Sequence, residues 1–213
     1  MLPRRHEGTV GEAPSSWMEH FTTLEVSNLL EIRWHGRGGQ GVVTSSELLA
    51  KAAILEGKYA QHFPEFGPER RGAPVKAYTR IDDKPIEIHC GVYEPDIVVA
   101  IDPALSLSKD IVLAGAKKGT VVALNVSKID DEFLKAAKDV GVEIYNCNAY
   151  GIALDVFGAP FYNTPMLGAL VKVTGIVKLD SVIEAIKGRF PEAVAEKNIT
   201  AVKRAYKEAK KYE

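Results

Sequence analysis

The sequence predicts an α/β fold, a Rossmann-like three-layer α/β/α sandwich whose mostly parallel sheet is made mixed by one antiparallel hairpin. Strand-like and helix-like stretches alternate from residue 31 to residue 145. Three short apolar runs, at residues 96–102, 120–125 and 142–145, have the composition of strands that are buried on both faces. Because such strands need cover on both sides, helices are expected on both faces of the sheet.

The spacing of the apolar residues predicts the position of each element. The expected strands lie at residues 31–35, 59–63, 75–81, 86–90, 96–102, 120–125 and 142–145. The expected helices lie at residues 42–56, 104–116, 130–140, 166–173, 179–189 and 192–212. Between residues 81 and 86 stands the turn sequence Asp82, Asp83, Lys84, Pro85, which predicts that the two flanking strands form the antiparallel hairpin.

One compact domain is expected to include most of the chain. A chain of 213 residues, of which 46% are hydrophobic, can bury one substantial core. Residues 1–23 are rich in glycine, proline, serine and charge, and we expect them to form a flexible N-terminal extension. Residues 24–213 are then a single α/β domain.

Charge and cysteine content limit the possible partners and compartments. Lysine and arginine number 27 against 28 aspartates and glutamates, a balance that gives no reason to expect nucleic acid as a partner. No apolar run approaches the length of a membrane span, so we expect no membrane partner and a cytoplasmic location. Two cysteines, Cys90 and Cys147, are too few for an iron–sulfur cluster or a four-thiolate zinc site, and no metal site is expected.

A glycine-rich loop lies between the first strand and the first helix and consists of Gly36, Arg37, Gly38, Gly39, Gln40 and Gly41. Its glycines satisfy the spacing G-x-G-x-x-G, which in this context predicts close approach of the backbone to a phosphate or to another chain. A dinucleotide site would also need an acidic residue at the end of the second strand, where Gln61, His62 and Phe63 stand instead. A tight turn that packs against a neighbour remains the alternative.

A second loop, residues 63–74, follows the second strand and carries Glu65, Glu69, Arg70 and Arg71. Loops beyond the carboxyl ends of the strands line the ligand crevice of an open α/β sheet, so this loop is expected on the same side as the glycine loop. Arginines there suit a phosphate or a carboxylate through bidentate hydrogen bonds. The alternative is a network of glutamates and arginines that holds the loop against a partner subunit.

Several other polar residues are expected to be structural. His35 and His89 end strands without a recognisable nucleophile as partner, so neither is assigned a catalytic role. Asp102 stands before a proline and is expected in a turn or as a helix cap, and Thr164 is expected to cap the helix that follows it. No catalytic residue is predicted in this chain.

Four segments of the chain, in this order, resemble the gamma subunits of 2-oxoacid:ferredoxin oxidoreductases, and of the pyruvate enzyme (pyruvate synthase) in particular. These segments are residues 32–41, 63–74, 95–102 and 163–170. The resemblance extends from residue 31 to the C-terminus and leaves out only the first thirty residues.

The resemblance implies a subunit that is not active alone. In that family thiamine diphosphate, with magnesium, lies between the alpha and beta subunits, and 4Fe–4S clusters lie in the beta and delta subunits. The assembled enzyme decarboxylates a 2-oxoacid, passes electrons to ferredoxin and transfers the acyl group to coenzyme A. The residues that the resemblance associates with coenzyme A binding or with a subunit interface are Gly36, Arg37, Gly38, Gly39, Gln40, Gly41, Arg70, Arg71 and Asn163.

Two other hypotheses remain open at this stage. The chain could be a stand-alone Rossmann-type oxidoreductase that binds NAD(P) or a flavin, although the missing ribose acid argues against it. It could also be an assembly module with no ligand of its own.

Overall fold

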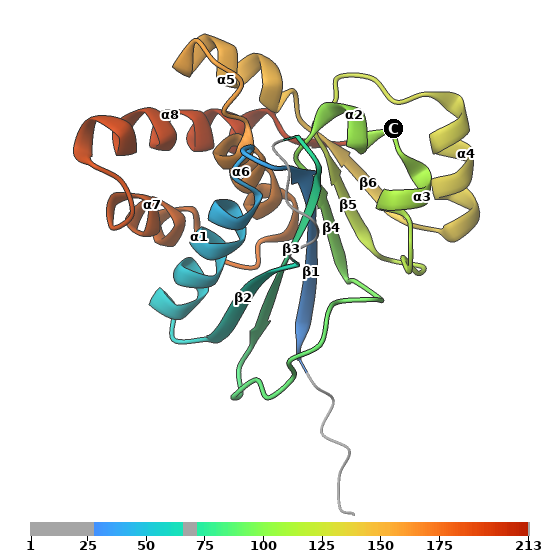
Figure 1. Ribbon diagram of the computed structural model, residues 1–213, viewed down its shortest axis with the longest axis horizontal. Helices are drawn as coiled ribbons and strands as arrows, with labels where there is room; N and C mark the ends of the chain where they lie inside the picture. The colour runs from blue at the N-terminus through green and yellow to red at the C-terminus, as the bar shows by residue number, and fades with distance from the viewer. Residues whose placement is uncertain (1–27, 66–71, 213) are drawn as a thin grey trace, which may run out of the picture.

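The computed structural model describes residues 28–65 and 72–212, which form one seven-stranded sheet between two layers of helices (Figure 1). The strands, in chain order, are β1 Leu30–Arg37, β2 Tyr59–Glu65, β3 Pro74–Asp82, β4 Ile97–Ala100, β5 Val121–Leu124, β6 Glu143–Asn146 and β7 Lys210–Lys211. The helices are α1 Val42–Leu55, α2 Pro103–Ser106, α3 Lys109–Val112, α4 Asp131–Val140, α5 Ala149–Phe157, α6 Asn163–Thr174, α7 Leu179–Lys187 and α8 Glu192–Glu208. The predicted N-terminal extension, Arg70 and Arg71 lie outside the described residues.

The strand order in the sheet is β2-β3-β1-β4-β5-β6-β7. β1, β4, β5 and β6 pair in parallel, whereas β3 pairs antiparallel with both β2 and β1, and β7 pairs antiparallel with β6. The α/β class and the mixed sheet are therefore confirmed. None of the helices among residues 28–65 and 72–212 is long and apolar enough to cross a membrane.

Two hydrophobic cores lie on opposite faces of the sheet. Trp34, Val99 and Ala123 belong to the larger core, which α1, α6, α7 and α8 cover. Val98 and Val122, their neighbours in sequence, point to the smaller core beneath α3 and α4. Because successive strand residues point to opposite faces, strands that are apolar throughout supply both cores, as the sequence predicts for a three-layer sandwich.

The predicted hairpin of residues 75–81 and 86–90 is wrong. The first segment is β3, but the second forms no strand. Both edges of β3 are already paired, with β2 on one side and β1 on the other, so no edge is left for residues 86–90. The carbonyls of Ile86 and Ile88 instead accept hydrogen bonds from the side chains of Gln61 and Arg80, so this segment covers the sheet face. The antiparallel partner of β3 on that side is β2, which precedes it in the chain.

The face of β2, β3 and β1 opposite to α1 is polar, and we call it the polar face. The strand registers place one row of side chains on it: Glu31, Arg33, His35, Gln61, Phe63, Glu65, Lys76, Tyr78 and Arg80. Arg80 is fully buried there, and its guanidinium contacts the Glu31 carboxylate at 2.7 Å, the Gln61 side chain and the carbonyls of Ile88 and Gly91. A buried charge with these partners holds the loop after β3 onto the sheet.

Four further details of the secondary structure differ from the prediction. The expected helix at residues 104–116 is two short helices, α2 and α3, of which α2 is capped by Asp102 through a 2.9 Å bond from the Leu105 N–H. The capping role of Asp102 is confirmed, whereas that of Thr164 is wrong, because α6 begins one residue earlier, at Asn163. α5 and the two-residue strand β7 were not predicted.

Candidate functional site

The glycine loop joins the carboxyl end of β1 to the start of α1, and its backbone needs glycine at two positions for steric reasons. A Cβ atom on Gly36 would lie 2.5 Å from Cγ2 of Val42, and one on Gly41 would lie 2.6 Å from Nδ2 of Asn163. Gly41 also has φ of +74°, in the left-handed region that favours glycine. Gly39 has φ of +89° but open space around it, so this glycine leaves room for something outside the chain.

The two polar side chains of the loop are used within the protein. The Gln40 amide nitrogen donates to Asp102 at 2.6 Å and to the Tyr162 hydroxyl at 2.7 Å, and its oxygen accepts from the Arg37 backbone N–H at 2.7 Å. The Arg37 guanidinium lies 3.4 Å from the Asp102 carboxylate and donates to the Gly72 carbonyl. These contacts tie the glycine loop to the ends of β4 and α6, so Arg37 and Gln40 position the loop.

The backbone N–H groups of the loop are only partly free. The Gly38 N–H donates to the Ala73 carbonyl at 2.9 Å, and the Gln40 N–H donates to the Arg37 carbonyl at 3.0 Å. Within the part of the chain that the structure describes, the N–H groups of Gly39 and Gly41 have no such partner. Those two donors, next to the N-terminus of α1, form the part of the loop that can bind an anion.

The described end of the second loop lies against the glycine loop. The Gly72 N–H donates to the Gly38 carbonyl at 3.4 Å, and Ala73 accepts from Gly38. The expectation that the two loops lie on the same side of the sheet is therefore met at Gly72 and Ala73. The predicted binding residues Arg70 and Arg71 precede Gly72 and lie outside the described residues.

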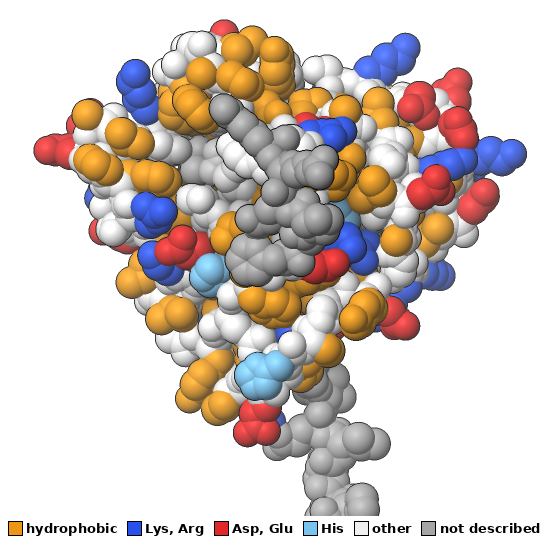
Figure 2. Space-filling view, viewed as in Figure 1, with side chains coloured by type: hydrophobic (Ala, Val, Ile, Leu, Met, Phe, Trp, Pro, Cys, Tyr) orange, Lys and Arg blue, Asp and Glu red, His pale blue; other side chains and the backbone are white. Residues whose placement is uncertain are grey.

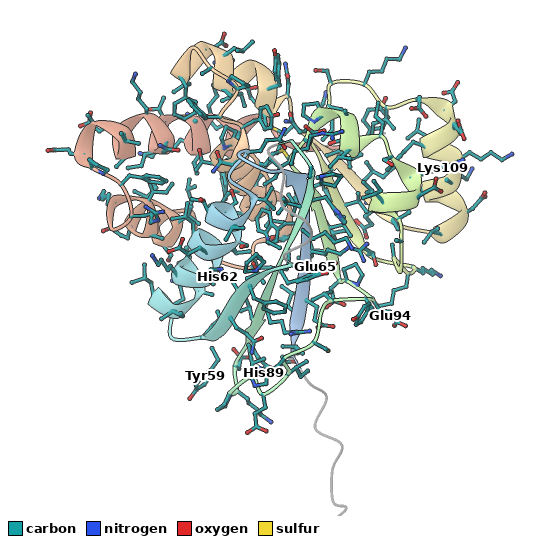
Figure 3. The ribbon with its side chains drawn as sticks, viewed as in Figure 1. Tyr59, His62, Glu65, His89, Glu94 and Lys109 are labelled. Carbon is teal, nitrogen blue, oxygen red and sulfur yellow. The ribbon has the colours of Figure 1, made fainter. Side chains whose placement is uncertain are left out.

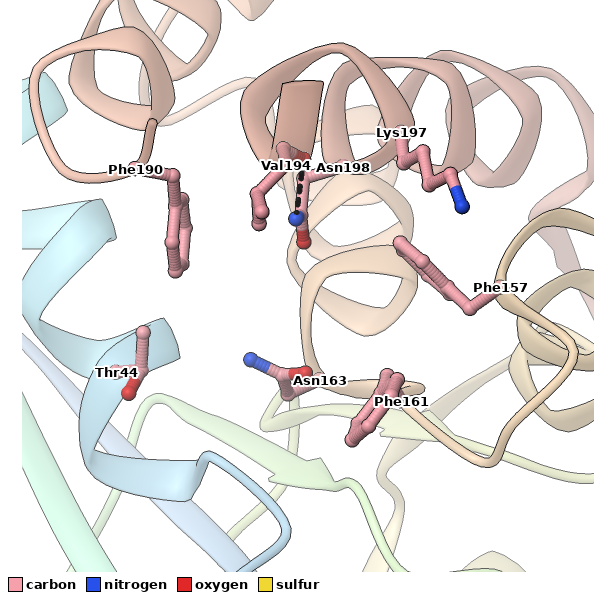
Figure 4. A pocket seen from close by; sticks show the side chains of 8 residues that line it. All are labelled: Thr44, Phe157, Phe161, Asn163, Phe190, Val194, Lys197 and Asn198. Carbon is pink, nitrogen blue, oxygen red and sulfur yellow. Dashed lines mark hydrogen bonds between the residues drawn. The ribbon is translucent and has the colours of Figure 1, made fainter. Parts of the chain in front are cut away.

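An apolar cavity of about 360 Å³ opens beside the glycine loop (Figure 4). It is lined by Thr44, Phe157, Phe161, Asn163, Phe190, Val194, Lys197 and Asn198. The side chain of Asn163, which contacts Gly41, points into the same space, so the predicted residue joins the loop to the cavity. We predicted neither the cavity nor a role for its three phenylalanines. These residues lie at the end of α5, just before α6 and just after α7, and only the fold brings them together.

A larger cavity, of about 540 Å³, lies on the polar face and is lined by Arg33, Glu65, Lys76 and Tyr78 among others (Figure 3 labels Glu65 on β2). Arg33 is buried and donates to Nε2 of His35 at 3.0 Å and to the carbonyls of Val112 and Ala114. Tyr78 donates to Glu65, and Lys76 lies 3.4 Å from the same carboxylate. The polar groups of this cavity therefore have partners within the chain.

The titratable groups around the polar cavity are held in fixed states. Burial, with the charges of Arg33 and Lys76, lowers the pKa of His35 to about 3, so the imidazole is neutral and accepts the Arg33 hydrogen bond. Burial and the bond to Glu65 raise the pKa of Tyr78, while that bond lowers the pKa of Glu65. His35 is a structural acceptor, in line with the expectation from the sequence.

The two cysteines are both free thiols, with Cys90 exposed and Cys147 buried. Burial raises the pKa of the Cys147 thiol to about 12, so it is not a thiolate at neutral pH. Within residues 28–65 and 72–212, no three histidine, cysteine, aspartate or glutamate side chains are grouped so that they could hold a metal ion.

Comparison with known proteins assigns the family. Residues 31–208 match the family model described as pyruvate ferredoxin/flavodoxin oxidoreductase. The pyruvate/ketoisovalerate oxidoreductases common subunit gamma of Thermococcus kodakarensis is 51% identical over 185 residues, which cover 87% of this chain and 100% of the relative. Pyruvate synthase subunit PorC of Methanocaldococcus jannaschii is 50% identical over 185 residues, covering 86% and 99% of the two chains.

A crystal structure shows the same fold. Pyruvate oxidoreductase subunit PORC of Thermotoga maritima superimposes with a TM-score of 0.74 and 41% identity, covering 87% of this chain and 99% of that one. The homologues are thus subunits of oxidoreductases that act on 2-oxoacids, which supports the gamma-subunit hypothesis and not a stand-alone dinucleotide enzyme. The chain belongs to the pyruvate ferredoxin/flavodoxin oxidoreductase family.

Proposed function

We propose that this chain is the gamma subunit of a pyruvate:ferredoxin oxidoreductase (pyruvate synthase) that also contains alpha, beta and delta subunits. The observation that carries the proposal is the match of residues 31–208 to the family, together with about half identity to gamma-type subunits over nearly their whole length. The assembled enzyme converts a 2-oxoacid to an acyl-coenzyme A and passes electrons to ferredoxin. Thiamine diphosphate, magnesium and 4Fe–4S clusters belong to the partner subunits, and ferredoxin meets this chain only indirectly.

The role that we assign to this chain is binding of coenzyme A and assembly, with no catalytic residue of its own. Gly39 and Gly41 offer backbone N–H groups beside the N-terminus of α1, which suits a phosphate. Arg70 and Arg71 supply the cations that a phosphate needs, and they come just before Gly72, which contacts the glycine loop. Coenzyme A, when bound, accepts the acyl group.

The remaining residues of the predicted site complete it in different ways. Gly36 leaves the space that Val42 fills, and the backbone of Gly38 bonds to Gly72 and Ala73. Arg37 and Gln40 hold the shape of the loop through Asp102 and other internal contacts. The Asn163 amide has no hydrogen-bond partner among residues 28–65 and 72–212, so it is available to a ligand. We also propose that residues 24–213 form one domain with residues 1–23 as its extension, in the cytoplasm.

The test is a kinetic comparison of the assembled enzyme with Arg70→Ala and Arg71→Ala variants. Loss of one charge-assisted contact of about 1.5–3 kcal/mol raises the KM for coenzyme A roughly tenfold or more, while the KM for pyruvate is unchanged. Arg204→Ala is the matched control, because Arg204 pairs with Asp155 and Glu208 on the surface. An unchanged KM for coenzyme A in both loop variants would contradict the proposed site.

A second measurement addresses the dinucleotide alternative. The isolated chain is titrated with NADH, NADPH and FAD while its melting temperature is followed. We expect no saturable stabilisation, since a ligand that binds only the folded state raises the melting temperature according to its affinity and concentration. Saturable stabilisation by one of the three would contradict the gamma-subunit proposal.

A further inference from the structure

Arg33 is buried on the polar face, and in the part of the chain that the structure describes it has no negatively charged partner. It is 5% exposed. Its guanidinium donates to Nε2 of the neutral His35 and to the backbone carbonyls of Tyr93, Val112 and Ala114. Burial lowers the pKa of Arg33, because desolvation disfavours the charged form. Buried charges are normally paired with an opposite charge, so an anion beside Arg33 is favoured.

The carboxylates of the polar face are engaged by other cations. Glu31 lies 2.7 Å from Arg80, and Glu65 lies 3.4 Å from Lys76. In Figure 2 acidic and basic side chains lie together near the centre of the view, where Figure 3 labels Glu65. The row of side chains on this face therefore carries three cations against two carboxylates, and the unmatched charge is that of Arg33.

The polar cavity, of about 540 Å³, adjoins this unmatched charge. Arg33 and Lys76 belong to its lining, together with the aromatic side chains of Phe63, Tyr78 and Tyr93. The rings of Phe63 and Tyr78 pack with their centroids 5.2 Å apart, and Tyr93, which is 75% exposed, lies at the rim. A cavity of this size, with aromatic walls and a few polar groups, is typical of a site for a small molecule.

The walls of the polar cavity are fixed by contacts within the chain. A Cβ atom on Gly115 would overlap the carbonyl oxygen of Tyr93, so these two segments touch only because residue 115 is glycine. A Cβ atom on Gly91 would lie 3.5 Å from the hydroxyl of Tyr78 and 3.7 Å from Cζ of Tyr93, so both tyrosines lie against the chain at Gly91. The cavity is therefore formed in advance, and a ligand would bind there without a large cost of ordering.

We propose that the polar cavity binds a small organic anion, with its carboxylate between Arg33 and Lys76 and a flat apolar body against the three aromatic side chains. The carboxylate supplies the charge that Arg33 lacks, and its planar shape matches the guanidinium. The aromatic lining favours an apolar ring over an inorganic ion. The polar face is opposite to α1, which lines the apolar cavity, so the inference goes beyond the proposed function and does not rest on it.

The experiment titrates the full-length chain with benzoate at neutral pH and measures binding by isothermal titration calorimetry. Benzoate is the probe because it joins a carboxylate to a flat apolar ring. Benzamide keeps the ring without the charge, and acetate keeps the charge without the ring. We expect saturable binding of benzoate at one site per chain, and binding of the other two that is weaker by about tenfold or more, since each loses one kind of contact.

Variants locate the bound benzoate. Lys76→Met removes one charge-assisted contact made by an exposed side chain and is expected to weaken binding by about tenfold or more. Tyr93→Ala removes an exposed ring and is expected to weaken binding without lowering the melting temperature. Lys211→Met is the matched control, because Lys211 is an exposed lysine that pairs with Glu143 at 2.9 Å at the other edge of the sheet. Arg33→Met is expected to abolish binding, and if it also lowers the melting temperature, Lys76→Met and Tyr93→Ala decide.

Three results would overturn the proposal. Absence of saturable benzoate binding would overturn the site, as would binding of benzamide as tight as that of benzoate. Binding of acetate or inorganic phosphate as tight as that of benzoate would overturn the apolar body of the ligand. An unchanged affinity for benzoate in both Lys76→Met and Tyr93→Ala would overturn the location. Each of these results would leave the gamma-subunit assignment in place, because that assignment rests on the family match and not on the polar cavity.

Discussion

The two cavities of this protein differ in how their polar groups are satisfied. On the polar face, Arg33, Tyr78, Glu65 and Lys76 all find partners within the chain, although that cavity is the larger of the two. Beside the glycine loop, Asn163, with Thr44 and Lys197, finds none among the described residues. Lys197 is exposed, whereas Thr44 and Asn163 are half-buried, so these three side chains lie where water or a ligand can satisfy them. The two cavities thus differ in the pairing of these groups as well as in size, and the coenzyme A site that we propose lies beside the cavity with unpaired groups.

The largest expected effect comes from removing the buried guanidinium on the polar face. Arg80→Met leaves Glu31 and two carbonyls without their buried donor, and we expect a loss of about 3–5 kcal/mol in the free energy of unfolding. Lys76→Met removes an exposed pair to Glu65 and is expected to cost less than about 1 kcal/mol. Urea unfolding monitored by circular dichroism measures both. Equal losses in the two variants would mean that the buried network does not stabilise this face.

The next effect is a pH dependence that His35 imposes. Its pKa is about 3 in the folded protein and about 6.5 when unfolded, so between these values the unfolded chain binds a proton that the folded chain does not. His35 therefore does not affect the free energy of unfolding above about pH 6.5. Below that pH it lowers the free energy of unfolding, by up to about 1.4 kcal/mol per pH unit. His35→Gln keeps an acceptor for Arg33 and is expected to flatten this slope between pH 6.5 and 5. Parallel slopes in the two proteins would show that His35 is not the group responsible.

The glycine loop offers a smaller, sterically defined test. Gly39→Ala meets only backbone strain at positive φ and is expected to cost on the order of 1 kcal/mol. Gly41→Ala adds a clash with the Asn163 side chain and is expected to cost on the order of 2 kcal/mol. Thermal unfolding of both variants, and of Gly41→Ala combined with Asn163→Ala, measures the clash separately. If Asn163→Ala does not restore the thermal stability lost in Gly41→Ala, the contact between the loop and α6 is not the reason that position 41 requires glycine.

The last test concerns the two polar side chains of the loop, of which Arg37 has the smallest expected effect. Gln40→Ala leaves Asp102 and Tyr162 without a donor and is expected to cost about 1–2 kcal/mol. Arg37→Ala removes a partly exposed ion pair and is expected to cost less than about 1 kcal/mol. Chemical denaturation ranks the two, and the reverse order would show that the guanidinium, and not the amide, holds the loop.

The sequence predicts those parts of the fold that depend on local patterns. β1, α1 and β4 follow from apolar spacing and from the glycines between them, and Asp102 follows from its place before Pro103. The pairing of β3 could not be predicted, because a turn-like sequence between residues 81 and 86 indicates a hairpin equally well whether or not an edge of β3 is free. Strand pairing is decided by competition between distant segments, which local patterns do not contain.

Only the glycine loop of the candidate site could be predicted from residue types and their spacing. Glycine spacing predicts the loop, whereas Asn163 was assigned from the family resemblance. The apolar cavity was not predicted, because α5, which lines part of it, was not predicted either. The sequence of α5 is apolar almost throughout, so it lacks the polar stripe that identifies a surface helix. Tyr150 and Leu154 account for this pattern, because they place large apolar side chains on the exposed side of α5 as well.

The most direct test of the gamma-subunit assignment is reconstitution of pyruvate- and coenzyme A-dependent ferredoxin reduction from separately purified subunits. The alpha, beta and delta subunits are assayed with and without this chain. We expect the full rate only when the chain is present, with saturation at a one-to-one ratio to the other subunits. An undiminished rate without the chain would contradict the assignment.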